Sequence, residues 1–365
     1  MSEAKAAAPA TTEVKVVKKT DPAKTKLIAT LKHTRPLTAA RYEPLGRFIF
    51  TGAEDNTVQR WDVADLQPAA DGKPVVTAKM ASLVGHDSWI RSIAFSKNGE
   101  TTFTGGYDGQ LFAWRTADEQ PAPVVKLAAH EGWIRAVVVS PDGKLLATCG
   151  NDRLVKLWRV DDFAAGKTPQ PVKVLTGHDC HVYNVAFHPD NKHFVSCDLK
   201  ANCKHWELDS GKLVREFAAT DLYKYDTTFR ADIGGARALT FSLDGTQLAA
   251  GGITKVTNAF AGIGVPAVAV IVWGTGKPQV QYTSKDAANA TIWGLEPHVD
   301  GYWIGVAGSR QANGGGLYFW RGADVNEFFK FKVTATGRDL AVHPQGHRLA
   351  IPQANQDLCI FDIAG

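Results

Sequence analysis

The chain of 365 residues has a formal net charge of +4, with 44% apolar and 21% charged residues, the composition of an ordinary soluble globular protein. No stretch approaches eighteen uninterrupted apolar residues, so we expect no membrane-spanning segment. The first 26 residues contain six lysines and three acidic residues and therefore carry most of the positive charge. The remainder is nearly neutral, so we expect no specific binding of nucleic acid.

Residues 1–26, rich in Ala, Thr and Lys, are expected to form a disordered tail. They lack the apolar run of a secretory signal and the arginines of an organelle transit peptide. The cysteines follow no repeating spacing and fit reduced thiols better than a disulfide framework; they are Cys149, Cys180, Cys197, Cys203 and Cys359. Both features predict a cytoplasmic protein.

Two phrases, HDSWIRSIAFS (86–96) and HEGWIRAVVVS (130–140), lie 44 positions apart and match in residue type at nearly every position. They belong to a longer repeat anchored on His33, His86, His130 and His178. A Thr or Ser follows each of these histidines after 18 positions, and a Trp follows after 10 more. Agreement at two fixed offsets in four units identifies an internal repeat.

Within each unit, short runs of alternating hydrophobicity such as SIAFS and AVVVS predict strands, and phrases such as SPDGK predict turns between them. Four strands in roughly 40–45 residues are typical of one blade of a β-propeller. The third strand of a unit ends in Trp or Phe, and this occurs seven times, at Trp61, Trp114, Trp158, Trp206, Trp273, Trp320 and Phe361. The sequence therefore predicts an all-β, seven-bladed propeller of four-stranded antiparallel blades over residues 27–365.

The last unit lacks a fourth strand, whereas the strand-like segment KLIATLK (26–32) precedes the first unit. We expect residues 27–31 to complete the last blade, because this pairing closes the ring and leaves no open edge between its ends.

These repeats resemble the WD-repeat (WD40) β-propeller family. Gly85-His86 and Gly177-His178 match the Gly-His element of the family, and Trp61-Asp62 is the one literal Trp-Asp pair. The resemblance extends from residue 27 almost to the end of the chain. It implies the fold and implies no particular activity.

Three units contain the residue types of a hydrolase charge-relay system, but a catalytic centre needs one reactive copy beside a substrate cleft. We therefore predict structural networks in which Asp accepts from His, His from Thr, and Thr from the indole of Trp, as in the tetrad of the family. The sets are His33–Thr51–Asp55–Trp61, His86–Thr104–Asp108–Trp114 and His130–Thr148–Asp152–Trp158. No catalytic residue and no enzymatic activity are expected.

The later units depart from this pattern. The fourth has Lys200 at the Asp position and Asp198 two residues earlier, so its network should be broken or rebuilt. Units five to seven lack the His, and we expect apolar packing to hold them. The fourth unit also contains His178, Cys180, His181, Cys203 and His205, whose spacing resembles no known zinc site. No metal and no cofactor are predicted.

The fifth residue after each His should begin the innermost strand, at the mouth of the central channel. Across the seven blades this column reads Thr38, Arg91, Arg135, Tyr183, Arg237, Thr291 and Arg338. No acidic residue occurs in the column, so the arginines should create a positive potential suited to carboxylate or phosphate. Trp89 and Trp133 lie two residues earlier, and the turn before the Asp contributes Glu54, Tyr107 and Asn151 to the same top face.

Two insertions in the fifth blade should emerge on this face. ITKVTNAFAGIGVPAVAV (253–270) includes Phe260, Ile263 and Val265, and TDLYKYDTTFRADIGGA (220–236) includes Tyr223, Tyr225 and Phe229. Long apolar loops of this kind are usually functional. They either form a lid over the channel or extend a docking surface.

We therefore predict a non-catalytic protein-interaction scaffold whose top face binds an acidic or phosphorylated peptide or protein patch. The expected contact residues are Arg91, Arg135, Arg237, Arg338, Trp89, Trp133, Tyr183, Tyr107 and Phe260. Trp, Tyr and Arg are enriched in interface hot spots, but the arginines could also pair within the propeller and the tryptophans cover blade junctions. The alternative functions are an enzyme or small-anion sensor at the channel mouth, or a rigid subunit of a larger assembly.

Overall fold

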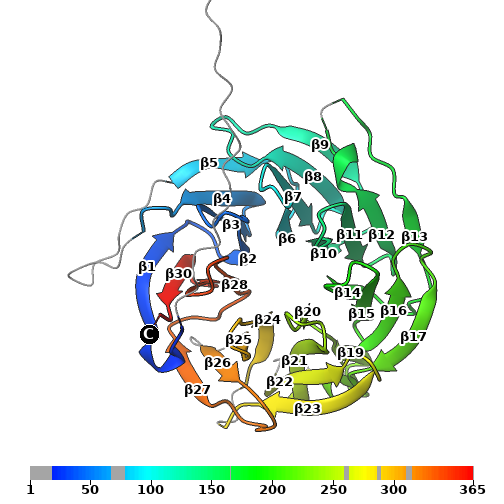
Figure 1. Cartoon of the computed structure of the whole chain (residues 1–365), viewed down its shortest axis with the longest axis vertical. Helices are drawn as coiled ribbons and strands as arrows, with labels where there is room; N and C mark the ends of the chain where they lie inside the picture. The colour runs from blue at the N-terminus through cyan, green and yellow to red at the C-terminus, as the bar shows by residue number, and fades with distance from the viewer. Residues whose placement is uncertain are drawn as a thin grey trace, which may run out of the picture.

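Seven antiparallel sheets of four strands stand around a central channel in the computed structural model (Figure 1). The structure describes residues 19–66, 79–164, 166–258, 263–285, 289–309 and 315–364. No α-helix occurs in these ranges, which contain only the short 3-10 helices η1 (Pro22–Lys24), η2 (Val160–Asp162) and η3 (Thr220–Leu222). The predicted seven-bladed propeller is confirmed.

The strands of each blade run in sequence order from the channel outward. Blade 1 consists of β2 (Leu37–Tyr42), β3 (Phe48–Ala53), β4 (Thr57–Asp62) and β5 (Lys79–Val84). Blade 2 consists of β6 (Ile90–Phe95), β7 (Thr101–Gly106), β8 (Gln110–Arg115) and β9 (Pro123–Ala128). Blade 3 consists of β10 (Ile134–Val139), β11 (Leu145–Gly150), β12 (Val155–Arg159) and β13 (Lys173–Leu175). Blade 4 consists of β14 (Val182–Phe187), β15 (His193–Asp198), β16 (Asn202–Glu207) and β17 (Leu213–Ala218).

The remaining blades keep this arrangement, except that the outermost strand of the last one comes from the start of the chain. Blade 5 consists of β20 (Ala238–Phe241), β21 (Gln247–Asn258), β22 (Ile263–Val272) and β23 (Lys277–Thr283). Blade 6 consists of β24 (Thr291–Pro297), β25 (Trp303–Gly308), β26 (Gly315–Trp320) and β27 (Phe329–Val333). Blade 7 consists of β28 (Ala341–Val342), β29 (Arg348–Pro352), β30 (Asp357–Asp362) and β1 (Lys26–Lys32). A separate two-stranded ribbon, β18 (Tyr223–Asp226) and β19 (Ala231–Gly234), lies between blades 4 and 5.

The N-terminal strand closes the ring as predicted. β1 pairs antiparallel with β30, from Leu27 opposite Phe361 to Leu31 opposite Leu358, and the two strands lie side by side in Figure 1. Ile28 and Leu31 are almost fully buried in the core shared by blades 7 and 1. Removing β1 would therefore expose both apolar surface and unpaired backbone.

Ordered contacts begin before the expected boundary at residue 26. The Thr20 hydroxyl donates to an Asp300 carboxylate oxygen at 2.5 Å and lies 2.6 Å from the Tyr302 hydroxyl, and Thr20 forms a β-bridge with Ala364. The tail boundary therefore lies earlier, because these hydrogen bonds fasten the segment to blades 6 and 7. The expectation for residues 1–18 lies outside the described residues.

The inner strands carry a β-bulge near their first residue, which decides what faces the channel mouth. In blades 1, 2, 3, 4 and 6 the pairing register skips one residue of the inner strand. The skipped residues are Thr38, Arg91, Arg135, Tyr183 and Trp293, respectively. A bulge turns its extra side chain away from the regular alternation. The expectation of Thr291 in blade 6 is therefore wrong by two residues, because the bulge places Trp293 in the equivalent position.

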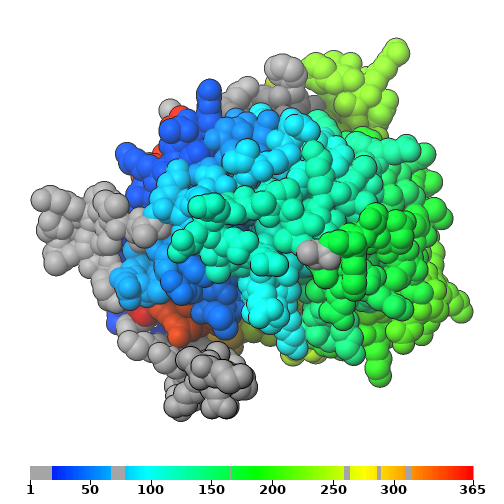
Figure 2. All heavy atoms as spheres, turned by 90° about the horizontal axis from the view of Figure 1, so that it is seen from above, coloured from blue at the N-terminus to red at the C-terminus, as the bar shows by residue number. Residues whose placement is uncertain are grey.

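We define the top face as the side on which the connections between blades and the turns between second and third strands emerge. Blade 5 is the tallest blade on this face, since β21 has 12 residues and β22 has 10. Figure 2 shows yellow-green chain, the colour of the β18–β19 segment, projecting from one face of the disc. Phe260 lies outside the described residues, and the side chain of Ile263 is likewise not described.

Candidate interaction site on the top face

Blades 2 and 3 each contain a complete buried network of the predicted kind. In blade 2, His86 Nδ1 donates to Asp108 at 2.9 Å, and the Thr104 hydroxyl donates to His86 Nε2 at 2.8 Å and accepts from Trp114 Nε1 at 2.9 Å. The directions follow because a carboxylate only accepts and an indole N–H only donates. In blade 3, the corresponding distances are 2.9, 2.7 and 3.0 Å, in a network of His130, Asp152, Thr148 and Trp158.

The burial of these networks fits a structural role. Thr104 and Thr148 have no exposed surface, so no substrate can reach either hydroxyl in the folded protein. Burial raises the pKa of the Asp108 and Asp152 carboxyls, but hydrogen bonds from their histidines and from neighbouring backbone N–H groups outweigh it, and each pKa is lowered. Both groups are therefore carboxylates at neutral pH and remain hydrogen-bond acceptors.

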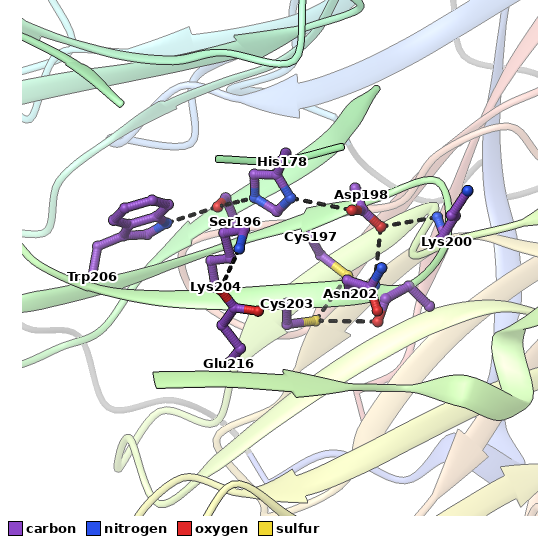
Figure 3. A network of polar contacts seen from close by, with 11 residues as sticks. His178, Ser196, Cys197, Asp198, Lys200, Asn202, Cys203, Lys204, Trp206 and Glu216 are labelled. Carbon is purple, nitrogen blue, oxygen red and sulfur yellow. Dashed lines mark hydrogen bonds and ion pairs between the residues drawn. The ribbon is translucent and has the colours of Figure 1, made fainter. Parts of the chain in front are cut away.

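Blade 4 rebuilds the network from a different position. His178 Nδ1 lies 3.2 Å from Asp198, and the Ser196 hydroxyl donates to His178 Nε2 at 2.7 Å and accepts from Trp206 Nε1 at 2.8 Å (Figure 3). Asp198 also accepts from the backbone N–H groups of Lys200 and Asn202. The carboxylate two residues earlier thus replaces the missing one, because it ends β15 beside the imidazole.

The network of blade 1 is incomplete, contrary to prediction. His33 uses Nε2 to reach Asp55 at 2.7 Å, and this orientation turns Nδ1 away from Thr51. His33 Nδ1 and Thr51 Oγ1 are both buried without a hydrogen-bond partner among the described residues. Trp61 is buried in the core shared by blades 7 and 1, so its indole contributes to packing rather than to a bond with Thr51.

Blades 4, 6 and 7 use histidine in a second way, on the bottom face, although we expected mainly apolar packing in units five to seven. His188, His298 and His343 follow their inner strands, and Nε2 of each donates to a glycine carbonyl of the next blade, at 2.9, 2.9 and 3.1 Å. Nδ1 of each accepts the backbone N–H two residues later, at 3.1 Å in all three. The acceptors of the interblade bonds are Gly245, Gly346 and Gly46. In the sequence, these interblade hydrogen bonds correspond to a His at the first position of the turns HPDN, HVDG and HPQG.

The networks of blades 2 and 3 also position the top-face residues. Asp108 accepts from the backbone N–H of Asp87, and the N–H of Tyr107 donates to the carbonyl of Trp89. In blade 3 the N–H of Asn151 donates to the carbonyl of Trp133 in the same way. The connections that end at Trp89 and Trp133 are thus fixed to the turns between the second and third strands of blades 2 and 3.

A continuous ladder of aromatic rings and guanidinium groups crosses the top face from blade 2 to blade 6. Trp133 stacks on Tyr107 with ring centroids 4.0 Å apart and planes 9° apart, and Trp89 lies 6.2 Å from Tyr107. The Arg135 guanidinium carbon lies 4.7 Å from the Trp133 ring and 4.5 Å from the Tyr183 ring. We call this set the top-face ladder: Trp89, Tyr107, Trp133, Arg135, Tyr183, Arg237 and Trp293.

Two arginines share the Tyr183 ring. The guanidinium carbons of Arg135 and Arg237 each lie 4.5 Å from its centroid, so the two carbons are at most about 9 Å apart, whatever their angle. Arg135 is further fixed by its Nε, which donates to Asn151 at 2.8 Å. Arg91 also lines the channel at this end. Two guanidinium groups held this close favour a bound carboxylate or phosphate.

Arg338 differs from the other arginines of the column. It forms an ion pair with Glu54 of blade 1, so the charge of Arg338 is balanced within the propeller. The expected column of four uncompensated arginines is therefore wrong in blade 7, because the turn residue of the neighbouring blade supplies the acid. The other arginines at the mouth belong to blades 2, 3 and 5.

Arg91, Arg135 and Arg237 together form what we call the arginine mouth of the channel. It leads into a cavity of about 410 Å³, whose lining also includes Trp293 and Glu296. Deeper in the channel, Arg41 of blade 1 bonds Asp339 of blade 7 at 2.7 Å. Burial raises the pKa of the Glu296 carboxyl to about 7, and nearby Arg41 only partly opposes this rise. The channel therefore has a positive rim and a carboxyl in its interior that is partly protonated near neutral pH.

The cysteines and histidines of the fourth unit do not converge on one point. Both ring nitrogens of His178 belong to the blade 4 network, and Cys203 faces Cys197 across the strand pair at 2.8 Å. His205 instead packs against His193 and Trp273 on the bottom half of the blade. Within the described ranges no group of three His, Cys, Asp or Glu residues is placed to hold a metal ion, nor is any helix long and apolar enough to cross a membrane.

Comparison with known proteins places the repeats in context. The family model "WD domain, G-beta repeat" matches residues 25–62, 77–115, 121–159 and 169–207. The chain is similar to striatin of Mus musculus, with 24% identity over 91 residues covering 25% of this chain and 12% of that protein. It is similar to DDB1- and CUL4-associated factor 10 of Xenopus laevis, with 28% identity over 92 residues covering 23% and 18%. It also resembles nuclear distribution protein PAC1 of Arthroderma otae, with 33% identity over 92 residues covering 24% and 17%. The matched segment thus spans less than a fifth of each relative.

Proposed function

Because this chain belongs to the WD-repeat β-propeller family, we propose that it is a non-catalytic scaffold that binds an acidic or phosphorylated segment of a protein partner on its top face. A role in protein interaction is in keeping with the relatives, one of which is named for its association with two other proteins. The nature of the partner and the face it uses are our proposals.

The top-face ladder is the observation that carries this proposal. Trp89 and Trp133 are each 42% exposed although they are large and apolar, and the guanidinium of Arg135 stacks between Trp133 and Tyr183. Trp, Tyr and Arg dominate interface hot spots because they combine large contact area with a polar or charged end. A partner with an acidic group for Arg91 and Arg135 and an apolar side chain for the tryptophans would use both properties.

Arg135 is restricted before binding, which favours affinity because little side-chain entropy is lost. Stacking on both Trp133 and Tyr183 restricts Arg135, and the Asn151 hydrogen bond fixes its Nε. The remaining nitrogens of that guanidinium are the ones available to a ligand.

Affinity capture with a charge-reversal variant tests the proposal. Arg91→Glu/Arg135→Glu reverses the charge of two arginines at the mouth. Arg115→Glu/Arg159→Glu makes the same change in net charge on exposed residues at the opposite ends of blades 2 and 3. Partners retained by the wild type and the Arg115/Arg159 variant should be lost from the Arg91/Arg135 variant. Equal capture by both variants would remove the top face from the proposal.

A small-anion sensor is the second candidate, because the arginine rim opens into a cavity of about 410 Å³. Calorimetric titration with inorganic phosphate separates the two functions. Binding of phosphate alone with micromolar affinity would favour the sensor, whereas a scaffold should bind free phosphate weakly and a phosphopeptide well.

A cytoplasmic location is part of the proposal. All five cysteines are free, including Cys197 and Cys203, whose sulfurs are 2.8 Å apart. A set of cysteines without disulfide bonds fits a reducing compartment. Imaging of a fluorescent fusion in the native organism tests this location.

A further inference from the structure

The connection between blades 4 and 5 forms an arm that no other interblade connection within the described residues contains. We call residues 220–234 the arm; it comprises η3, β18 and β19. In blades 2 and 3 the corresponding connection is a short turn ending at Trp89 or Trp133, immediately before the inner strand. An isolated two-stranded ribbon is marginally stable in water, so the arm needs anchors.

The anchors of the arm are present and specific. Leu222 has no exposed surface, and its carbonyl accepts from the N–H of Gly235 at 2.9 Å. The Tyr223 hydroxyl donates to Asp232 across the ribbon at 2.6 Å, and Lys224 Nζ donates to the Val256 carbonyl of blade 5 at 2.7 Å. The arm is therefore fastened both internally and to the tall strands of blade 5.

Gly234 is required at the base of the arm. Its φ of +114° lies in the region that favours glycine, and a Cβ there would lie 1.9 Å from the Leu222 carbonyl oxygen. The chain must turn back sharply at this point to enter blade 5, and only glycine permits so close an approach. The position of the arm is thus fixed by the backbone at its root.

The tip of the arm is preformed and exposes aromatic side chains. The buried Asp226 carboxylate accepts from the N–H groups of Thr228 and Phe229, at 2.9 and 3.0 Å, which holds the turn. Tyr225 is 49% exposed and Phe229 is 54% exposed. Large apolar side chains on an anchored, projecting element are typical of an interaction surface rather than of a core.

The exposed charges near the arm are mostly positive. Lys224, Arg230 and Lys255 are exposed and Asp221 is the exposed acid, whereas Asp226 and Asp232 are engaged in hydrogen bonds of the arm itself. The arm and the mouth therefore favour the same partner chemistry, apolar side chains among acidic ones.

One extended peptide can reach from the arm to the mouth. Eight residue steps separate Phe229 from Arg237, so their Cα atoms are at most about 28 Å apart. Arg237 itself contacts the Tyr183 ring at 4.5 Å and belongs to the top-face ladder. A segment of about ten extended residues spans this distance.

We propose that the arm is a second docking point for the same acidic partner segment. The partner places its acidic group at the arginine mouth and an aromatic or aliphatic side chain against Tyr225 and Phe229. This inference rests on the proposed function, since it assumes that the mouth binds the acidic group. It assigns the arm to the docking surface and not to a lid.

A phage-displayed library of random 16-residue peptides, selected on the full chain, provides the probe. Selected peptides are synthesised with a fluorescent label, and their affinities are measured by anisotropy for three variants. Tyr225→Ser/Phe229→Ser alters the arm, and Arg91→Gln/Arg135→Gln alters the mouth. Leu243→Ser/Val299→Ser is the matched control, since these residues are 57% and 54% exposed in turns on the bottom face.

The arm variant should weaken binding about tenfold to a hundredfold, the usual effect of removing hot-spot aromatics, and the bottom-face control should bind like the wild type. Peptides truncated to their acidic half should bind the wild type and the arm variant equally. Unchanged binding of full-length peptides to the arm variant, with loss on the mouth variant, would overturn the role of the arm and leave the proposed function standing. Selected peptides that bind the arm variant and the mouth variant as tightly as the wild type would overturn both the role of the arm and the proposed function.

Discussion

Blades 2 to 4 and blades 5 to 7 have the same strand topology but are stabilised in different places. In blades 2 to 4, a His, a Ser or Thr, a Trp and an Asp form a buried network within one blade, near the top face. In the second group, no such network occurs among the described residues. Blades 6 and 7 instead bond to the next blade through His298 and His343 on the bottom face, a bond that blade 4 also makes to blade 5 through His188. The first device holds a blade together, and the second holds neighbouring blades together.

The difference has a functional consequence. The networks of blades 2 and 3 fix the connections that carry Trp89 and Trp133, so the most regular part of the ring also presents the stacked part of the ladder. Blade 5 instead contributes the adjoining arm and its tall strands. Regular repeats thus supply a rigid platform, while the irregular blade supplies an element found once in the described part of the chain.

Deleting residues 1–32 should have the largest effect, because it removes the strand that joins the two parts of the ring. β30 would lose its outer partner, and the sites of Ile28 and Leu31 in the core would be left empty. We expect no soluble folded protein, measured by circular dichroism and size-exclusion chromatography. Deletion of residues 1–18 leaves every described contact in place and should give a folded protein. Normal folding of both truncations would contradict ring closure by β1.

His130→Ala should lower the free energy of unfolding by about 3 kcal/mol, because buried Asp152 and Thr148 lose their partner. His33→Ala should cost about 1 kcal/mol, since His33 already lacks its bond to Thr51. Urea unfolding followed by tryptophan fluorescence compares the two variants. Equal losses would show that the blade 1 network is as complete as that of blade 3.

Acidification should weaken the interblade bonds on the bottom face. Burial lowers the pKa of His343 to about 4 from an ordinary 6.5, so between these values the unfolded chain binds a proton that the folded protein excludes. The free energy of unfolding is therefore unaffected by His343 above pH 6.5 and decreases as the pH falls from 6.5 toward 4. The loss at pH 5 is about 2 kcal/mol. His205, whose pKa burial also lowers to about 4, acts in the same direction.

Urea unfolding at pH 7 and pH 5 measures this loss. His343→Gln keeps an amide donor but does not titrate, so it should reduce the pH dependence by about 2 kcal/mol. A variant with the wild-type pH dependence would show that His343 is not held neutral by the fold.

Trp133→Ala should have the smallest effect on stability, about 1 kcal/mol, because the side chain is 42% exposed and loses mainly its stacking on Tyr107. Its effect on capture of a top-face partner should be much larger. Trp133→Phe keeps an aromatic ring and serves as the control. A strong loss of stability without a loss of binding would assign the ladder to folding alone.

The sequence was sufficient for the fold and for part of the site. Strand alternation, the repeated His and Trp offsets and the unpaired segment 26–32 predicted seven blades and their closure, because side-chain periodicity and edge pairing follow directly from sequence. Arg91, Arg135 and Tyr183 were placed correctly at the mouth for the same reason, since they follow a repeated His at a fixed distance.

Other features depend on spatial relations that spacing does not encode. A one-residue bulge places Trp293 at the mouth, two residues after the predicted Thr291. The ion pair of Arg338 with Glu54 joins residues 284 positions apart, and the replacement by Asp198 in blade 4 depends on side-chain reach rather than on position. The ladder itself joins five blades, so no single repeat contains it.

Hydrogen–deuterium exchange of the chain with and without a captured partner tests the central claim most directly. We predict slower exchange over residues 86–91, 130–135 and 223–234, with no change in the bottom-face turns at 43–46 and 298–301. Protection confined to those bottom turns, with none at the ladder, would contradict the account.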